Sequence, residues 1–301
     1  MRVTEVAVES GARGGAGSAL VPVPGTPTVL MARQDGSPRP ALLALDLDTM
    51  STARTGSRSP GDLRDAALGP DGAGWVAGLH GLGRLEAGSP PRLEVVAVAR
   101  LPRYPGRVTR VGPGLLSVGN PYWTTSVLVD EQTLSLAGRL RVPQVEHAVP
   151  DGSGVTLLDV RHGWVGRLDL RTRRAVRTGS MVAGTWSARV GDSLVVLAGR
   201  RLLRVALAAP AAEPAVLVEA LPAASAPGWE LAGAGEDGTV VLTHRDVVLV
   251  LGPGGPPQRV ETRHHVSAAA YLPERRTVVA ALHRQPADPS GQLLTVVELD
   301  D

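Results

Sequence analysis

A turn signal recurs along this chain at nearly regular intervals, and each copy introduces the same pattern of short apolar segments. Successive copies are 47, 42, 38, 41, 45 and 37 residues apart, about 42 on average. Repetition on this scale restricts the chain to a repeat architecture, in which each unit buries its apolar surface against the next copy. The turns lie at Pro24, Asp71, Pro113, Asp151, Asp192, Asp237 and Glu274.

Each turn is followed by two short segments rich in valine and leucine. GWVAGLHG follows Asp71 and GTVVLTHR follows Asp237, and each is succeeded by a second segment such as DVVLVLGP. Apolar runs of this length between glycine and proline turns indicate β-strands. Glycine and proline, 36 and 25 of 301 residues, are spread along the whole chain, and no segment shows sustained helical periodicity. The sequence therefore predicts an all-β fold.

A four-stranded propeller blade takes ~40–50 residues, which matches the repeat. Seven copies of about 43 residues account for the whole chain. We therefore predict a single seven-bladed β-propeller over residues 1–301. The last copy contains only three expected strands, at 266–271, 277–283 and 293–299, and the segment Val3–Glu9 supplies the missing outer strand. Pairing the first strand with the last protects the open edges of the ring. Two packed β-sandwiches are the alternative, but they do not explain an unpaired strand at each end.

Composition excludes several classes of function. Arginine supplies all 31 basic residues against 29 acidic ones, so the net charge is only +2 and no extended polyanion-binding surface is expected. The absence of cysteine rules out disulfides, thiolate metal sites and a cysteine nucleophile. The N-terminal segment lacks the pattern of a secretory signal, and no run of 18 apolar residues occurs. We expect a cytoplasmic monomer without nucleic-acid or membrane partners, from a GC-rich bacterial genome.

The repeat also assigns each loop to one face of the ring. Strands alternate in direction, so the loops before the first strand of each blade and the hairpins between the second and third strands share one face, which we call the upper face. The recurrent turns mark the opposite, lower face. All the histidines map to the upper face: His80, His147, His162, His244, His264, His265 and His283.

Carboxylates and most aromatic residues map to the same face, which predicts a concave site at the mouth of the channel. We expect His147, His265, Glu146 and Glu230 to be catalytic, because the first strand of each blade lines the channel. A hairpin histidine can instead satisfy a backbone carbonyl, and a hairpin tryptophan can pack on its own blade, so this structural alternative stays open for each. The residues expected to bind substrate are His80, Arg107, Tyr122, Trp123, His162, Trp186, Trp229, His244 and His283.

The ends of the expected third strands carry a family resemblance. LALDLDTM, VLVDEQT and GRLDLRT resemble the aspartate–threonine turns of bacterial propellers with YVTN-type or quinoprotein-type blades. In size and architecture the chain is also similar to propellers of the virginiamycin B lyase type. That resemblance implies a site with histidine, glutamate and magnesium, so a divalent metal is the one cofactor to consider, and its ligands are not assigned. The tryptophan–phenylalanine signature of those blades is missing, and phenylalanine is absent altogether.

Two functions fit this upper face. The first is a small-molecule enzyme of lyase, isomerase, cyclase or hydrolase type in bacterial specialised metabolism, with Glu146 or a histidine as base and another histidine as acid. The second is a non-catalytic scaffold for protein–protein interaction that uses the same face. Histidines around a channel favour the enzyme, because a scaffold has little need of them. A small-molecule ligand is accordingly expected rather than a protein.

Overall fold

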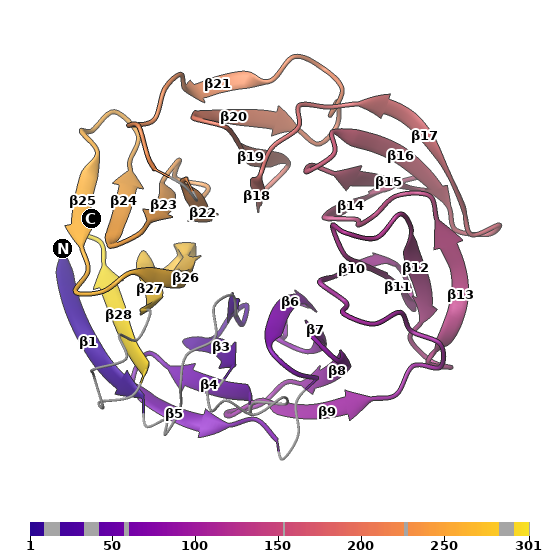
Figure 1. Cartoon of the computed structure of the whole chain (residues 1–301), viewed down its shortest axis with the longest axis horizontal. Coiled ribbons are helices and arrows are strands. Elements are labelled where there is room, and N and C mark those ends of the chain that lie inside the picture. The colour runs from indigo at the N-terminus through magenta and orange to yellow at the C-terminus, as the bar shows by residue number, and fades with distance from the viewer. Residues whose placement is uncertain are drawn as a thin grey trace.

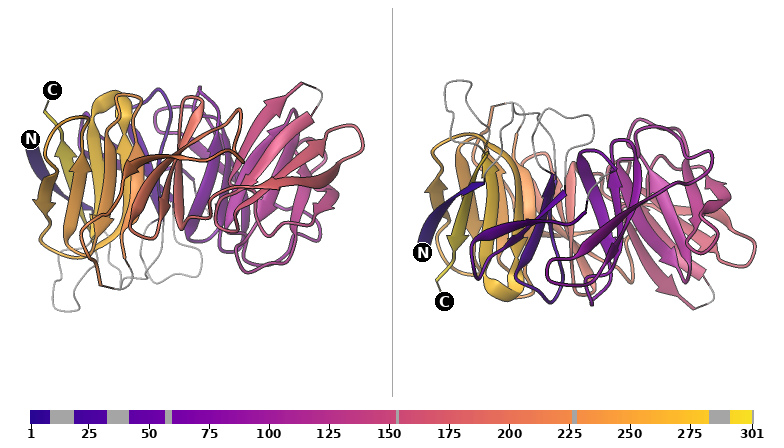
Figure 2. Two further views of the ribbon diagram at one scale, coloured as in Figure 1. Left: turned by 90° about the horizontal axis from the view of Figure 1, so that it is seen from above. Right: turned by 90° about the horizontal axis from the view of Figure 1, so that it is seen from below.

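The chain folds into a ring of seven four-stranded antiparallel sheets (Figure 1). The predicted seven-bladed, all-β propeller is therefore confirmed in this computed structural model. Among the described residues the one helical element is a single 3-10 turn, η1 (Pro273–Arg275). In the side views of Figure 2 the strands run steeply between the two faces of the ring. The residues that the structure describes are 1–8, 19–32, 42–56, 60–152, 154–225, 228–282 and 292–300.

The innermost strand of each blade lines the centre of the ring, and the second strand lies directly behind it (Figure 1). The innermost strands are β2 (Leu20–Pro22), β6 (Leu63–Leu68), β10 (Arg107–Gly112), β14 (His147–Asp151), β18 (Trp186–Val190), β22 (Glu230–Ala234) and β26 (Val266–Leu272). The second strands are β3 (Thr28–Ala32), β7 (Gly74–Gly78), β11 (Leu115–Gly119), β15 (Gly154–Asp159), β19 (Ser193–Ala198), β23 (Val240–His244) and β27 (Thr277–Leu282).

The third and fourth strands complete each blade toward the rim. The third strands are β4 (Leu42–Asp46), β8 (Gly81–Glu86), β12 (Ser126–Asp130), β16 (Trp164–Asp169), β20 (Arg201–Ala206), β24 (Val247–Leu251) and β28 (Gln292–Glu298). The outermost strands are β5 (Ser51–Arg54), β9 (Arg92–Val96), β13 (Ser135–Leu140), β17 (Arg174–Ser180), β21 (Ala215–Val218), β25 (Gln258–Glu261) and β1 (Arg2–Val8).

The first strand of the chain closes the ring, as predicted. β1 pairs antiparallel with β28 from Arg2 opposite Glu298 to Val8 opposite Gln292, which makes it the outer strand of the last blade. Glu9, the expected end of this strand, lies outside the described residues. The pairing covers the edge of β28, so the seventh sheet has four strands like the other six.

Apolar cores lie between the blades rather than in the centre of the ring. One core, for example, joins Trp75 of β7 to Val118 of β11, and another joins Leu128 of β12 to Leu157 of β15. Each sheet is thus buried on both faces, which explains why the second strands are apolar at successive positions instead of alternating. Small aliphatic side chains fill these spaces in a chain without phenylalanine or isoleucine.

The aspartate–threonine endings form a repeated turn on the lower face. Asp130 Oδ1 accepts hydrogen bonds from the backbone N–H of Gln132 at 3.1 Å and of Thr133 at 2.9 Å. These backbone N–H groups, that of Thr133 first, lower the pKa of Asp130. The next residue, Leu134, has a left-handed backbone with φ of 52°. The same turn follows β4 and β16, so the motif reflects hydrogen bonding within the turn.

Candidate functional site

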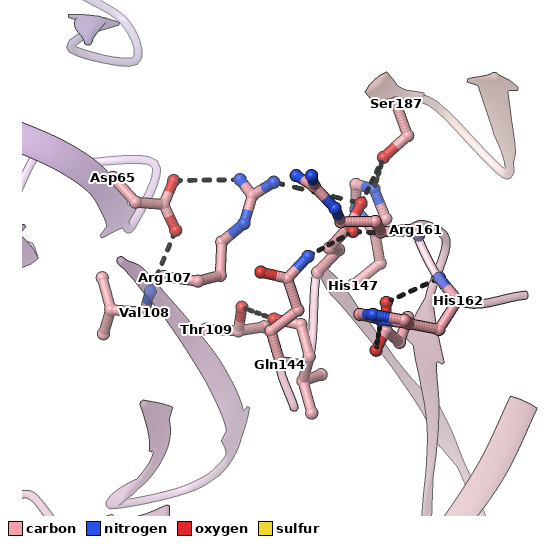
Figure 3. Close-up of polar contacts among 12 residues, drawn as sticks. Asp65, Arg107, Val108, Thr109, Gln144, His147, Arg161, His162 and Ser187 are labelled. Atoms are coloured by element: carbon pink, nitrogen blue, oxygen red, sulfur yellow. Dashed lines mark hydrogen bonds and ion pairs between the residues drawn. The ribbon is translucent and has the colours of Figure 1, made fainter. Parts of the chain in front are cut away.

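Side chains from four neighbouring blades meet at the upper mouth of the channel (Figure 3). Arg107 Nη1 donates to Asp65 Oδ1 at 3.2 Å, and its Nη2 atom lies 3.9 Å from Glu146 Oε2. Ser187 Oγ donates to the same Glu146 oxygen at 3.0 Å and lies 2.8 Å from His147 Nε2. We call Asp65, Arg107, Glu146, His147 and Ser187 the mouth network.

The propeller repeat places these residues together. Arg107, His147 and Ser187 lie 40 residues apart in succession, at or beside the first residue of β10, β14 and β18. Asp65 reaches the network through a shift in the pairing of β6 between Leu63 and Asp65, and a bulge of this kind redirects a side chain. Its Oδ2 atom also accepts the backbone N–H of Val108 at 2.9 Å, which locks β6 to β10.

Glu146 is the most connected member of the network, with a side chain only 5% exposed. Its Oε1 atom accepts hydrogen bonds from Gln144 Nε2 at 2.7 Å and from the backbone N–H of Arg161 at 3.1 Å. Its Oε2 atom receives the Ser187 hydroxyl and faces Arg107. Both oxygens are therefore committed to partners within the fold, as a buried carboxylate requires.

His147 is neutral in this setting. Burial, reinforced by the positive charges of Arg107 and Arg189, lowers the pKa of His147 to about 3. Ser187 has one hydroxyl proton and donates it to Glu146, so the proton between Ser187 and His147 must come from Nε2 of the imidazole. The Nδ1 atom of His147 has no hydrogen-bond partner among the residues that the structure describes.

This arrangement differs from a serine–histidine–carboxylate triad. In a triad the imidazole lies between the serine and the carboxylate and takes the hydroxyl proton. Here Ser187 lies between Glu146 and His147, and its proton points to the carboxylate. A histidine with a pKa of about 3 is also a weak base at neutral pH. The mouth network therefore joins neighbouring blades and does not activate a nucleophile in this arrangement.

The hairpin histidines make contacts within or beside their own blades. His162 Nδ1 lies 2.7 Å from Oδ2 of the fully buried Asp159, in the same hairpin. His80 donates its backbone N–H to Pro60 O at 2.7 Å, and its ring lies against Gly61. Both residues therefore have structural contacts, but neither ring meets a backbone carbonyl as the structural alternative supposes, because the His162 ring meets a carboxylate and His80 donates its backbone N–H.

Glu230 belongs to a second group, in the sixth blade. His244 Nδ1 lies 2.9 Å from Gly228 O, and its ring centre is 5.4 Å from that of Trp229. Trp229 is fixed in turn by a hydrogen bond from its Nε1 atom to Pro222 O at 2.9 Å. Burial raises the pKa of the half-buried Glu230, and the nearby His244 opposes this shift. Glu230 and Glu146 were both expected to be catalytic, but they share no contact and belong to two different groups of residues.

Other expected site residues do not join either group. His265 is exposed and forms no hydrogen bond or ion pair with any described residue. Trp186 is 42% exposed, Trp123 is half-buried and Tyr122 is 87% exposed. His283 lies outside the described residues. Within the described ranges, no three histidine, aspartate or glutamate side chains are grouped closely enough to hold a metal ion.

Sequence reasoning missed Ser187, Gln144 and Asp159. An isolated serine or glutamine carries no motif, and contacts across blades leave no local spacing to detect. The usable signal was the repeat itself, because Ser187 lies 40 residues after His147 at the matching strand start. Alignment of the seven inner strands would have placed both residues at the channel mouth.

A shallow groove of about 460 Å³ opens on the lower side, between the second and third blades. Its charged walls are engaged in ion pairs, since Arg110 Nε lies 3.0 Å from Glu131 Oε1 and Arg84 Nη2 lies 3.1 Å from Glu94 Oε2. The groove is away from both groups described above. Residues lining it include Asp71, Trp75, Arg84, Arg110, Glu131 and Gln132.

Within the described part of the chain, the structure holds no helix with the length and apolar character needed to cross a membrane.

Solved structures share this ring, whereas no family model and no curated protein matches the sequence. A streptogramin B lyase superimposes with a TM-score of 0.65 and 10% identity, over 98% of this chain and 97% of that chain. The Swd1 propeller domain of Myceliophteria thermophila superimposes with a TM-score of 0.66 and 14% identity, over 97% of this chain and 99% of that chain. Hydrazine synthase of Kuenenia stuttgartiensis superimposes with a TM-score of 0.63 and 12% identity, over 96% of this chain and 97% of that chain. At these identities the likeness establishes the seven-bladed propeller fold alone, which both enzymes and other proteins use.

Proposed function

We propose that this propeller is a binding module that presents its upper face to a partner protein. The observation that carries the proposal is that the titratable side chains of the mouth network are bonded within the fold, while tyrosine side chains on the same face are exposed. The histidine and carboxylate side chains of the mouth network are committed to one another, whereas Tyr104 and Tyr122 are 53% and 87% exposed. Exposed tyrosines are typical anchors of protein interfaces.

The loops that carry these tyrosines are braced, which supports a binding role. Asn120 Nδ2 donates to Tyr104 O at 2.7 Å, and Asn120 Oδ1 accepts the backbone N–H of Tyr122 at 2.8 Å. Tyr104 has φ of 63°, a left-handed conformation that is unfavourable for a bulky residue and is retained where surrounding contacts enforce it. These contacts order the backbone of the two loops, and a loop that is ordered before binding loses less entropy when a partner docks.

The test is capture of partners from an extract of the source cell by three immobilised forms. The upper-face variant combines Tyr104→Asn, which tolerates the left-handed backbone, with Tyr122→Ser. The control combines Val176→Ser with Val216→Ser, which alters exposed side chains on the outer strands β17 and β21. We expect quantitative mass spectrometry to find proteins retained by the wild type and the control but lost from the upper-face variant. Identical capture by all three forms, or no specific capture, would overturn the proposal.

A small-molecule site at Glu230 is the second candidate. Burial raises the pKa of Glu230, and a carboxylate with a shifted pKa is a candidate functional group, with the paired rings of Trp229 and His244 in the same blade. A thermal-shift screen of metabolites tests it, with Glu230→Gln as the variant and His265→Gln as a matched upper-face control. Ligands that stabilise the wild type and the control but not Glu230→Gln would support this site. A screen without such ligands would eliminate it.

A further inference from the structure

Carboxylates are available to arginines at the lower end of the third and fourth blades but are scarce at the upper end. At the lower end, Arg110 pairs with Glu131 at 3.0 Å and Arg173 with Asp130 at 3.6 Å, whereas the exposed Arg171 and Arg174 form no ion pair with a described residue. The four upper loops of the same blades, at 97–106, 120–125, 141–146 and 160–163, carry four arginines and a single carboxylate, Glu146. That carboxylate is 5% exposed and already faces Arg107.

The four upper-loop arginines are exposed, and their side chains form no ion pair with any residue in the described ranges. Two exposed tyrosines lie in the same loops. Arginine and tyrosine are, with tryptophan, the side chains enriched at the energetic centres of protein interfaces. We call the following residues the arginine–tyrosine patch: Arg100, Arg103, Tyr104, Tyr122, Arg141 and Arg161.

Hydrogen bonds tie the four loops into one surface. Asn120 links its own loop to the first through Tyr104 O at 2.7 Å, and to the third through its backbone N–H and Pro143 O at 3.2 Å. The third loop is linked to the fourth by the bond of 3.1 Å from the Arg161 backbone N–H to Glu146. The two blades are neighbours on one side of the ring (Figure 1), so the patch is a single site spread over two blades.

We propose that this patch binds an acidic segment of a partner protein, an inference that rests on the binding function proposed above. Unpaired guanidinium groups in a fixed frame match carboxylates, which they bind through paired hydrogen bonds. Nucleic acid is a poorer match, because the patch covers two blades of seven and the net charge of the chain is only +2. A short acidic segment requires positive charge only where it docks.

Fluorescence anisotropy with a labelled dodecapeptide of glutamate and aspartate tests the inference. The patch variant is Arg141→Glu with Arg161→Glu. The control is Arg92→Glu with Arg174→Glu, two exposed arginines away from the upper loops, so both variants carry the same change in net charge. We expect the wild type and the control to bind the peptide alike, and the patch variant to bind about tenfold more weakly. Binding should weaken as salt screens the charges.

Three results would overturn the inference. They are no peptide binding by the wild type, equal weakening in both variants, and tighter binding of a single-stranded dodecanucleotide than of the peptide. Equal weakening would assign binding to overall charge, and tight nucleotide binding would assign the patch to nucleic acid. If peptide binding fails while the tyrosine variant still loses a captured partner, the binding function stands and only the acidic nature of the partner is wrong.

Discussion

At the scale of single residues, Ser187 joins the Glu146 carboxylate to the His147 ring, which has no other hydrogen-bond partner among the described residues. Its hydroxyl donates to Glu146 and accepts from His147, so one oxygen connects β18 to the blade that precedes it. Polar groups with little access to water are costly when left without a hydrogen bond. Ser187 therefore contributes to the junction between the fourth and fifth blades.

Ser187→Ala should lower the free energy of unfolding by about 1–3 kcal/mol, because both neighbours lose a hydrogen bond. Urea denaturation measures the change. Ser193→Ala is the control, since its hydroxyl meets only the exposed Asp192, and we expect a change below about 0.5 kcal/mol. Equal effects of the two substitutions would show that the bridge adds nothing to stability.

The protonation of His147 makes stability depend on pH. Its pKa is about 3 in the folded protein against 6.5 for an ordinary histidine. Between these values the unfolded chain binds a proton that the folded protein does not, so the free energy of unfolding falls as the pH drops below about 6.5. The wild type should therefore lose about 2 kcal/mol more than His147→Gln between pH 7 and pH 5.

Denaturation at both pH values checks this difference. Other groups with shifted pKa values, such as Asp65 and Asp159, are present in both proteins and cancel in the comparison. His265→Gln controls for the loss of a histidine outside the network. Parallel pH profiles of the wild type and His147→Gln would contradict a neutral, buried imidazole.

At the scale of elements, close approaches within a strand fix where aromatic rings lie. In β16, Trp164 covers Gly166, and a Cβ atom added to Gly166 would fall 2.0 Å from the indole ring. The ring cannot remain there if residue 166 has a side chain. Trp164 also packs against the core between the third and fourth blades, so it is a packing residue.

Gly166→Ala should destabilise the protein by about 1–3 kcal/mol, because the indole ring must move. Gly138→Ala is a matched control in β13, where the nearest atom to an added Cβ lies at 3.4 Å. Urea denaturation followed by tryptophan fluorescence reports both stability and the environment of Trp164. Equal stability of the two variants would show that the ring adapts without cost.

At the scale of the whole molecule, closure depends on a single strand pair between the two ends of the chain. β1 supplies seven residues opposite β28, and Val6 is buried in the core between the seventh and first blades. Without β1 the third strand of the last blade would become an open edge, which other chains can pair with.

Deletion of residues 1–8 should therefore cause self-association and lower the melting temperature. Static light scattering and calorimetry measure the two effects. The control is Val3→Ser, which changes a side chain that is 49% exposed and leaves the strand in place. A truncated protein that stays monomeric and melts like the wild type would show that β1 is dispensable for closure.

The sequence by itself determined the number of blades, the closure and the face on which each loop lies. These features depend on the spacing of turns and on apolar segments, which are local and repeat seven times, so the pattern survives variation within single blades. Only the tertiary structure decided which polar side chains contact one another. Glu146, His147 and Ser187 meet only because the ring brings residues about 40 positions apart to one mouth. The low pKa of His147 follows from burial and neighbouring arginines, and neither is local in sequence.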